Sequence, residues 1–264
     1  MISAPSNSSK TPVLEMTGVS VGSWNDPDTA IVEEVNWSVE AGEYWLLGGM
    51  HGSGKSDFLA MTDGLMYPLK GSYRLYGREM PGVGDELLAE RLRVGLVFDG
   101  GQLFHHLTIE ENIALPLRYH RALARGDLKN NVKTILDATG LSPWAGRLPG
   151  TMGRAWQKRA GLARALALRP EVLLLDNPLS GLDSRQQQWW LETLGQLSAG
   201  EGLGAGRPMT LVVTAQDLRP WRNRAAHVAI LQKGRFHSLG RQTQLSGLTD
   251  PLVRELLSEQ AAPV

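Results

Sequence analysis

Unbroken apolar runs divide the chain into predicted buried strands. Such runs are typical of strands that are covered on both faces of a parallel sheet. They occur at residues 45–48, 94–98, 172–175, 211–214 and 228–231. The last run is expected to begin a final pair of strands that ends near Leu239.

A second type of strand shows alternation of apolar and polar residues. Val35, Trp37 and Val39 alternate with Asn36 and Ser38, which predicts a strand with one wet face. We therefore expect an antiparallel layer beside the core, formed by residues 13–21, 31–39 and 72–76.

Helical spacing fills the segments between the apolar runs. Thr108 can cap a helix with Glu111 three residues on, and Pro116 is expected to end that helix. Further helices are predicted at 127–139 and 154–168, and a short amphipathic helix within 246–260 that docks through Leu252, Leu256 and Leu257. This succession of buried strands and helices predicts an α/β fold.

The composition excludes several classes of function. Lys plus Arg and Asp plus Glu number 27 each, so no net basic charge recruits nucleic acid, and no nucleic-acid partner is expected. The chain has no Cys, which excludes disulfides, thiolate metal sites and a Cys nucleophile. No run approaches the ~18 apolar residues of a membrane span. The polar residues 1–12 lack a signal-type apolar core, which indicates a disordered tail on a cytoplasmic protein.

Residues 44–61, YWLLGGMHGSGKSDFLAM, carry phosphate-binding chemistry. They contain the spacing G-x-x-x-x-G-K-[ST] between an apolar strand and a helix-compatible segment. The glycines let the backbone curl so that successive N–H groups point at a phosphate. The lysine would reach the β- and γ-phosphates, and the following serine would bind Mg²⁺. The predicted ATP-binding residues are Gly49, Met50, His51, Gly52, Ser53, Gly54, Lys55, Ser56 and Asp57.

Two positions outside this stretch join the predicted site. Asp176 follows the apolar run 172–175, where a carboxylate can bind the water shell of the Mg²⁺ held by Ser56. Trp24 lies where an aromatic ring could stack on adenine, although a partly buried loop tryptophan is an equal alternative. The expected cofactors are ATP and Mg²⁺.

The order of these motifs resembles that of the nucleotide-binding subunit of an ABC transporter. The matching segments are the phosphate loop at 49–56, VF with its loop at 97–104, KRAGLARALAL at 158–168, LLLDNP at 173–178, SGLD at 180–183 and TAQDL at 214–218. The resemblance implies a P-loop NTPase domain at 13–248, with a mostly parallel core sheet, an antiparallel layer and a helical subdomain at about 100–160. Residues 249–264 would form a C-terminal helix and tail. The segments FDGGQLFHHLTIEENIALPL, KRAGLARALAL and DPLVRELL further resemble the ATPases of Mce/Mla-type lipid transporters.

Three positions depart from the catalytic pattern of that family. Where the family carries a glutamate after the Walker B aspartate, this chain has Asn177, whose amide cannot accept a proton from water near neutral pH. The family's switch histidine falls at Gln216, which can hydrogen-bond a γ-phosphate but cannot be a cation. The glutamine after VF is replaced by Asp99, which could ligate Mg²⁺ or repel phosphate. These departures predict impaired hydrolysis.

The signature loop departs from the family as well. Its Leu-Ser-Gly-Gly, which contacts the ATP held by the opposite subunit, reads Met152-Gly153-Arg154-Ala155 here. The missing hydroxyl and the two added side chains are expected to weaken closure of a dimer, although Arg154 could bind phosphate as a cation. Asp183, in the loop that faces a partner subunit in the family, is retained.

Two classes of function remain open from the sequence. The chain is either a degenerate subunit that binds ATP, or a fully active transport motor that uses substituted catalytic residues. A phosphate-loop small-molecule kinase is the weakest alternative, because it explains neither SGLD nor the motif order. The resemblance implies two partners, an integral-membrane permease and a second, identical or different, ATP-binding subunit. The expected location is the inner face of the cytoplasmic membrane, reached through the permease.

Overall fold

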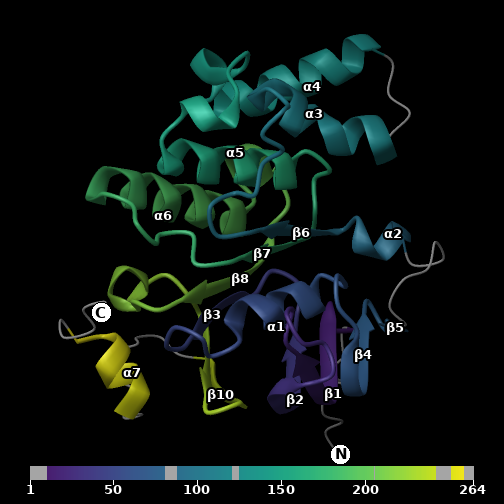
Figure 1. Cartoon of the computed structure of the whole chain (residues 1–264), viewed down its shortest axis with the longest axis vertical. Coiled ribbons are helices and arrows are strands. Elements are labelled where there is room, and N and C mark those ends of the chain that lie inside the picture. Colours follow the sequence, from purple (N-terminus) through teal and green to yellow (C-terminus); the bar gives the residue numbers. More distant parts are fainter. Residues whose placement is uncertain (1–10, 81–87, 121–124, 205, 242–250, 259–264) are drawn as a thin grey trace, which may run out of the picture.

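Figure 1 shows the computed structural model of the chain, which describes residues 11–80, 88–120, 125–204, 206–241 and 251–258. The strands are β1 (Leu14–Gly22), β2 (Ala30–Val39), β3 (Tyr44–Gly48), β4 (Pro68–Leu75), β5 (Arg78–Glu79), β6 (Val94–Val97), β7 (Val172–Leu175), β8 (Thr210–Ala215), β9 (His227–Gln232) and β10 (Arg235–Arg241). The helices are α1 (Lys55–Thr62), α2 (Leu88–Arg91), α3 (Ile109–His120), α4 (Arg125–Ala138), α5 (Arg154–Leu166), α6 (Ser184–Ala199) and α7 (Pro251–Leu256). The expected tail at 1–12 lies almost entirely outside the described residues.

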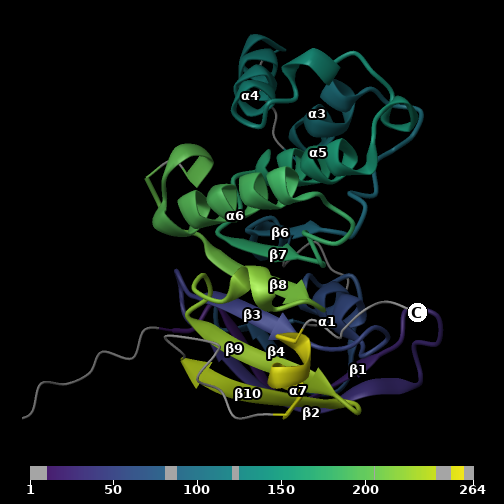
Figure 2. The same cartoon turned by 90° about the vertical axis from the view of Figure 1, so that its left-hand side faces the viewer.

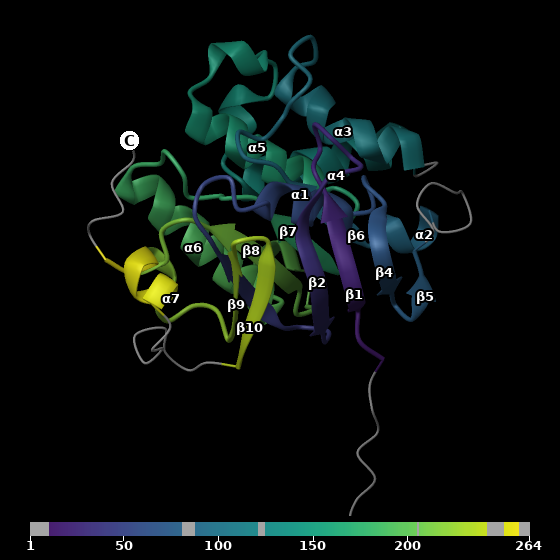
Figure 3. The same cartoon turned by 60° about the horizontal axis from the view of Figure 1, so that its bottom comes forward.

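The ten strands of the described residues belong to one sheet, in the order β5-β4-β1-β2-β10-β9-β3-β8-β7-β6. The run from β9 to β6 is parallel throughout, and β1, β2, β4 and β5 pair antiparallel with one another. Three of these antiparallel strands, β1, β2 and β4, lie side by side in Figure 3. This arrangement confirms the predicted fold class of a mostly parallel core with an antiparallel layer.

The core strands are buried on both faces, which explains their unbroken apolar runs. Along β3, Tyr44 and Leu46 face one hydrophobic cluster, while Trp45 and Leu47 face another. The first cluster is covered by α5, α6 and α7, and the second by α1 and the antiparallel layer. Figures 1 and 2 show α5 and α6 on one side of β6 and β7 and α1 on the other. The sheet is therefore a rigid platform for the loops at its edge.

A helical subdomain lies at one end of the molecule, where α3, α4 and α5 enclose a third hydrophobic cluster. The predicted capping box is present: the Thr108 hydroxyl oxygen accepts the backbone N–H of Glu111, and the Glu111 carboxylate accepts the backbone N–H of Thr108. The predicted end of this helix at Pro116 is wrong, since α3 continues to His120. Burial of Ile113 and Leu117 on either side outweighs the one backbone hydrogen bond that proline removes.

The helix α7 docks as predicted near the end of the chain. Leu252 and Leu256 are buried against the cluster beside α6, and Leu257 packs partly against it. The backbone N–H of Leu218 donates to the Leu256 carbonyl, which ties α7 to the segment that follows β8. Among the described residues, no helix is long and apolar enough to cross a membrane.

Candidate nucleotide-binding site

Four neighbouring parallel strands deliver the candidate residues to one edge of the sheet. The carboxyl ends of β3, β8, β7 and β6 lead respectively to the phosphate loop, Gln216, Asp176 with Asn177, and Asp99. Ligands of open α/β sheets bind at this edge. Here a cavity of about 240 Å³ is lined by His51, Gly52, Ser53, Gly54, Lys55, Ser56, Asp57, Asp99, Asp176, Asn177 and Gln216. The structure thus brings together most of the residues that the sequence predicted.

The conformation of the phosphate loop requires its glycines. Gly52 and Gly54 adopt positive φ angles of 74° and 86°, in the region that side chains disfavour. Gly49 has no such angle, but a Cβ atom there would lie 2.8 Å from the Leu231 carbonyl oxygen. Gly54 is the N-cap of α1, so the positive end of that helix faces the cavity. The loop therefore has the local geometry of an anion-binding site.

Lys55 is embedded in this loop, with only 6% of its surface exposed. Its ammonium group donates to the carbonyl oxygens of Gly49 and Met50, both at 2.7 Å, and to Ser53 Oγ at 3.2 Å. Burial lowers the pKa of Lys55 to about 8, and the nearby charge of Asp176 partly opposes that shift. The lysine is thus a desolvated donor beside the predicted phosphate position, where it would bind more strongly than in water.

Asp176 is buried and oriented by a neighbouring strand. The Thr214 hydroxyl, at the end of β8, donates to Asp176 Oδ1 at 2.9 Å and accepts the backbone N–H of Asn177 at 3.0 Å. Carboxylate and hydroxyl oxygens are ligands that Mg²⁺ prefers, so Asp176 and Ser56 fit the metal chemistry expected of them. Among the described residues, no group of three or more His, Asp or Glu side chains could hold a metal alone. A Mg²⁺ ion here would therefore also need phosphate and water oxygens.

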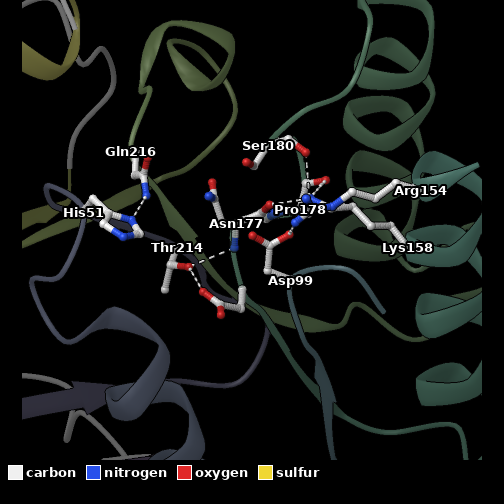
Figure 4. Close-up of polar contacts among 10 residues, drawn as sticks. His51, Asp99, Arg154, Lys158, Asn177, Pro178, Ser180, Thr214 and Gln216 are labelled. Atoms are coloured by element: carbon white, nitrogen blue, oxygen red, sulfur yellow. Dashed lines mark hydrogen bonds and ion pairs between the residues drawn. The ribbon is translucent and has the colours of Figure 1, made fainter. Parts of the chain in front are cut away.

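Asn177 has a left-handed backbone, with a φ angle of 45°. Asparagine tolerates this conformation better than most residues with a side chain. Its carbonyl oxygen accepts a hydrogen bond from Lys158 Nζ at 3.0 Å, and its side chain lines the cavity. Figure 4 shows Asn177 between the His51 side of the site and the Asp99 side. The residue therefore faces the ligand position but offers an amide there.

Asp99 is paired with two cations of α5. Lys158 Nζ lies 2.8 Å from Asp99 Oδ1, and Arg154 Nη2 lies 3.2 Å from the same oxygen (Figure 4). Lys158 is 1% exposed and also donates to the Ser180 carbonyl, so it links Asp99 to the loop after β7. Burial lowers the pKa of Lys158 below its usual range, and Asp99 partly opposes that shift. The carboxylate that sequence left open as a metal ligand is thus held by an intramolecular ion pair.

The remaining predicted residues lie outside the lining of the cavity. The backbone N–H of Trp24 donates to Asp57 Oδ1 at 2.6 Å, while its side chain is 56% exposed beside the loop. Gly153 is the N-cap of α5, which Arg154 and Ala155 begin, and the Asp183 carboxylate accepts the Gln186 N–H as the N-cap of α6. Gly153, Ala155, Asp183 and Trp24 are not among the residues that line the cavity.

Two residues of the site escaped sequence reasoning. Thr214 was recognised only as part of a turn motif, yet it orients both Asp176 and Asn177. Lys158 was seen only within a helical motif, although it lies four residues after Arg154 and hence on the same helix face. The four-residue spacing indicates that Arg154 and Lys158 lie close together. The sequence does not indicate that both pair with Asp99.

The sheet topology and the phosphate loop define a P-loop NTPase. Residues 32–180, more than half of the chain, match the family described as ABC transporter. The chain belongs to that family.

Among curated relatives, the chain is 32% identical to the sulfate/thiosulfate import ATP-binding protein CysA of Mycolicibacterium paratuberculosis, over 83% of this chain and 57% of that protein. It is 28% identical to the methionine import ATP-binding protein MetN 1 of Acinetobacter baylyi, over 86% of this chain and 62% of that protein. The chain thus spans about 60% of the length of these relatives.

A solved structure has the same fold. The ATP-binding cassette MJ0796, determined as a dimer in a post-hydrolysis state with ADP and Pi, superposes with a TM-score of 0.74 at 25% identity. The match covers 86% of this chain and 98% of that one. Most of the chain therefore has the architecture of an ATP-binding cassette.

Proposed function

We propose that this chain is the ATP-binding subunit of a membrane transport system and that it hydrolyses ATP slowly. One observation carries the proposal. A phosphate loop with a buried lysine faces Asp176 across a small cavity, while the side chain next to Asp176 is the amide of Asn177. The site has the groups that hold Mg·ATP but not the family's general base.

The structure offers no ready substitute for that base around the cavity. Asp57, His51 and Asp99 also line it. Asp57 Oδ1 accepts the backbone N–H of Trp24 at 2.6 Å, and His51 Nδ1 lies 3.3 Å from Gln216 Nε2. Asp99 is paired with Lys158 at 2.8 Å and Arg154 at 3.2 Å. Both ion pairs involve Oδ1 of Asp99, so this carboxylate is already engaged within the subunit. Gln216 is an amide and cannot serve either. Slow hydrolysis follows from these assignments.

Arg154 belongs to the signature loop and affects how that loop could bind ATP. As a cation at that position it could bind the phosphate of an ATP held by an opposite subunit. In this chain its guanidinium instead pairs with Asp99 of the same subunit. Contact with a partner's ATP would have to break this pair, so the signature loop is expected to close weakly.

Calorimetric titration of the full chain with Mg·ATP tests nucleotide binding. Wild type should bind, and Lys55→Ala should lose most of the affinity, because charge-assisted hydrogen bonds to phosphate are lost from a desolvated site. Lys70→Ala is a matched control, since Lys70 is an exposed lysine of β4 outside the cavity. Equal affinities of Lys55→Ala and wild type would overturn the assignment.

A groove next to the helical subdomain supports an integral-membrane permease as partner. It measures about 500 Å³, lies between α3, α5 and the end of β6, and is lined by Phe98, Phe104, Leu115, Pro116, Tyr119 and Leu168, among others. Tyr119 is 79% exposed and Phe104 47%. Exposed aromatic residues in a groove are typical of interaction sites. The permease would place this chain on the cytoplasmic face of the membrane.

We further propose a second, intact ATPase as partner. In the family arrangement each ATP lies between the phosphate loop of one subunit and the signature loop of the other. A homodimer of this chain would therefore have no glutamate base in either site. A heterodimer would keep one base, supplied by the partner. Transport by the complex should fall far less with Lys55→Ala here than with the equivalent change in the partner, whereas brisk turnover by a complex with only this ATPase chain contradicts the proposal.

The cargo is proposed to be a lipid. The support is the resemblance of the 98–117 and 158–168 segments and of the closing DPLVRELL to Mce/Mla-type ATPases. The curated relatives named above carry sulfate or methionine in their names, so the test must separate these classes. Mass spectrometry of ligands that co-purify with the membrane complex should find phospholipid; a complex that binds only small ions or amino acids contradicts the proposal.

A further inference from the structure

His51 and Gln216 form a pair at the phosphate loop that the proposed chemistry does not use. Gln216 Nε2 lies 3.3 Å from His51 Nδ1 (Figure 4). We propose that the His51 imidazole donates a hydrogen bond to the terminal phosphate of ATP. From the phosphate loop, it would thus replace the imidazole that the switch position lacks. This inference rests on the proposed binding of ATP.

The position of the pair favours the reacting end of the nucleotide. Strand β8, which leads to Gln216, lies between β3 and β7 in the sheet. The pair therefore spans the gap between the phosphate loop and the Asp176–Asn177 segment, and all of these residues line one cavity. Trp24, the predicted adenine contact, is tied instead to Asp57, on the α1 side of the loop. His51 thus lines the cavity with Asp176 and Asn177, whereas Trp24, the predicted adenine contact, does not.

The contact with Gln216 bears on which ring nitrogen of His51 can donate. With the Gln216 amide nitrogen toward the ring, Nδ1 of His51 accepts, and the neutral imidazole carries its proton on Nε2. An Nε2–H group is a donor for a phosphate oxygen. Gln216 in this role is a positioning residue, because it sets the tautomer and the orientation of the ring.

Three charged groups of the cavity, Lys55, Asp99 and Asp176, already have partners or a role assigned above. Lys55 donates to loop carbonyls, and Asp99 is engaged by two cations. Asp176 carries a negative charge that repels phosphate unless a metal ion intervenes. His51 is exposed and has the one imidazole that lines this cavity. It is therefore the side chain best suited to add a contact that ADP does not make.

The test compares Mg·ATP and Mg·ADP affinity by calorimetry for the full chain. His51→Ala should weaken Mg·ATP binding by about tenfold, the effect of one hydrogen bond to a charged group, and change Mg·ADP binding by less than about twofold. Gln216→Ala should shift the ATP/ADP ratio in the same direction but less. His237→Ala is the matched control, because His237 is an exposed histidine of β10 outside the cavity.

The outcomes separate this inference from the proposed function. If the ratio of Mg·ATP affinity to Mg·ADP affinity is unchanged in His51→Ala, whether both affinities fall or neither does, the role of His51 is overturned. The proposal that the chain binds nucleotide is not affected by that result. A wild type that binds neither nucleotide overturns the proposed function itself. Retained Mg·ADP affinity in His51→Ala shows that the variant is folded.

Discussion

Lys55 keeps its ammonium group inside the phosphate loop, where burial lowers its pKa from 10.5 to about 8. The unfolded chain therefore binds more protons than the folded one between these two values, so this group makes wild type gain stability as pH rises through the window. The gain relative to Lys55→Met, which has no titrating group, should approach roughly 3 kcal/mol. Urea unfolding of both proteins at pH 8 and at pH 10.5 measures this gain. If the difference in free energy of unfolding between the two proteins is the same at both pH values, Lys55 is not desolvated in the folded chain.

How far single residues could be predicted depends on how local their chemistry is. The phosphate loop could be predicted because its glycines, lysine and serine act through consecutive backbone positions. Asp99, Arg154 and Lys158 could not be assembled from the sequence, because their contact joins the end of β6 to α5 across more than fifty positions. Sequence therefore left Asp99 open as a metal ligand, whereas its geometry makes it the centre of an ion pair.

The capping box of α3 provides a prediction for an element. Thr108→Ala removes the acceptor for the Glu111 N–H and the side-chain partner of Glu111, so it should destabilise the chain by about 1 kcal/mol. Thr134→Ala is the control, because Thr134 is an exposed residue within α4 whose hydroxyl bonds only its own helix. Denaturant midpoints compare the two. Equal midpoints for both variants would show that the box does not stabilise α3.

The helices and strands could be predicted best where one pattern of hydrophobic residues dominates the segment. The buried strands followed from apolar runs, because a sheet covered on both faces requires them. The course of α3 through Pro116 could not be predicted from local signals. It depends on Ile113 and Leu117 packing into a core whose other walls come from α4 and α5.

For the whole molecule, the aromatic groove predicts how the chain reaches its membrane partner. Tyr119→Asp places a charge in an apolar interface and should reduce co-purification with the permease by at least about tenfold. Leu148→Asp is the control, because Leu148 is also an exposed apolar residue of the helical subdomain but does not line the groove. Nucleotide binding should persist in both variants. Equal recovery of the permease with both would place the docking site elsewhere.

The account as a whole rests on a site that holds ATP without a general base, and Asn177 is the residue that decides it. Asn177→Glu would supply the carboxylate. Asn177→Gln introduces a side chain of the same size as that glutamate, at the same strained backbone position with φ 45°, but without the charge. The pair thus isolates the base from any effect on folding.

Steady-state phosphate release at saturating Mg·ATP by these three proteins, each purified without any other ATPase subunit, is the most direct measurement. General-base catalysis contributes about 10²- to 10⁴-fold, so Asn177→Glu should exceed both wild type and Asn177→Gln by at least about 10²-fold. Wild-type turnover at the ordinary enzyme rate of roughly 10 per second, unchanged by Asn177→Gln, would contradict the account and show a working motor with substituted catalytic residues.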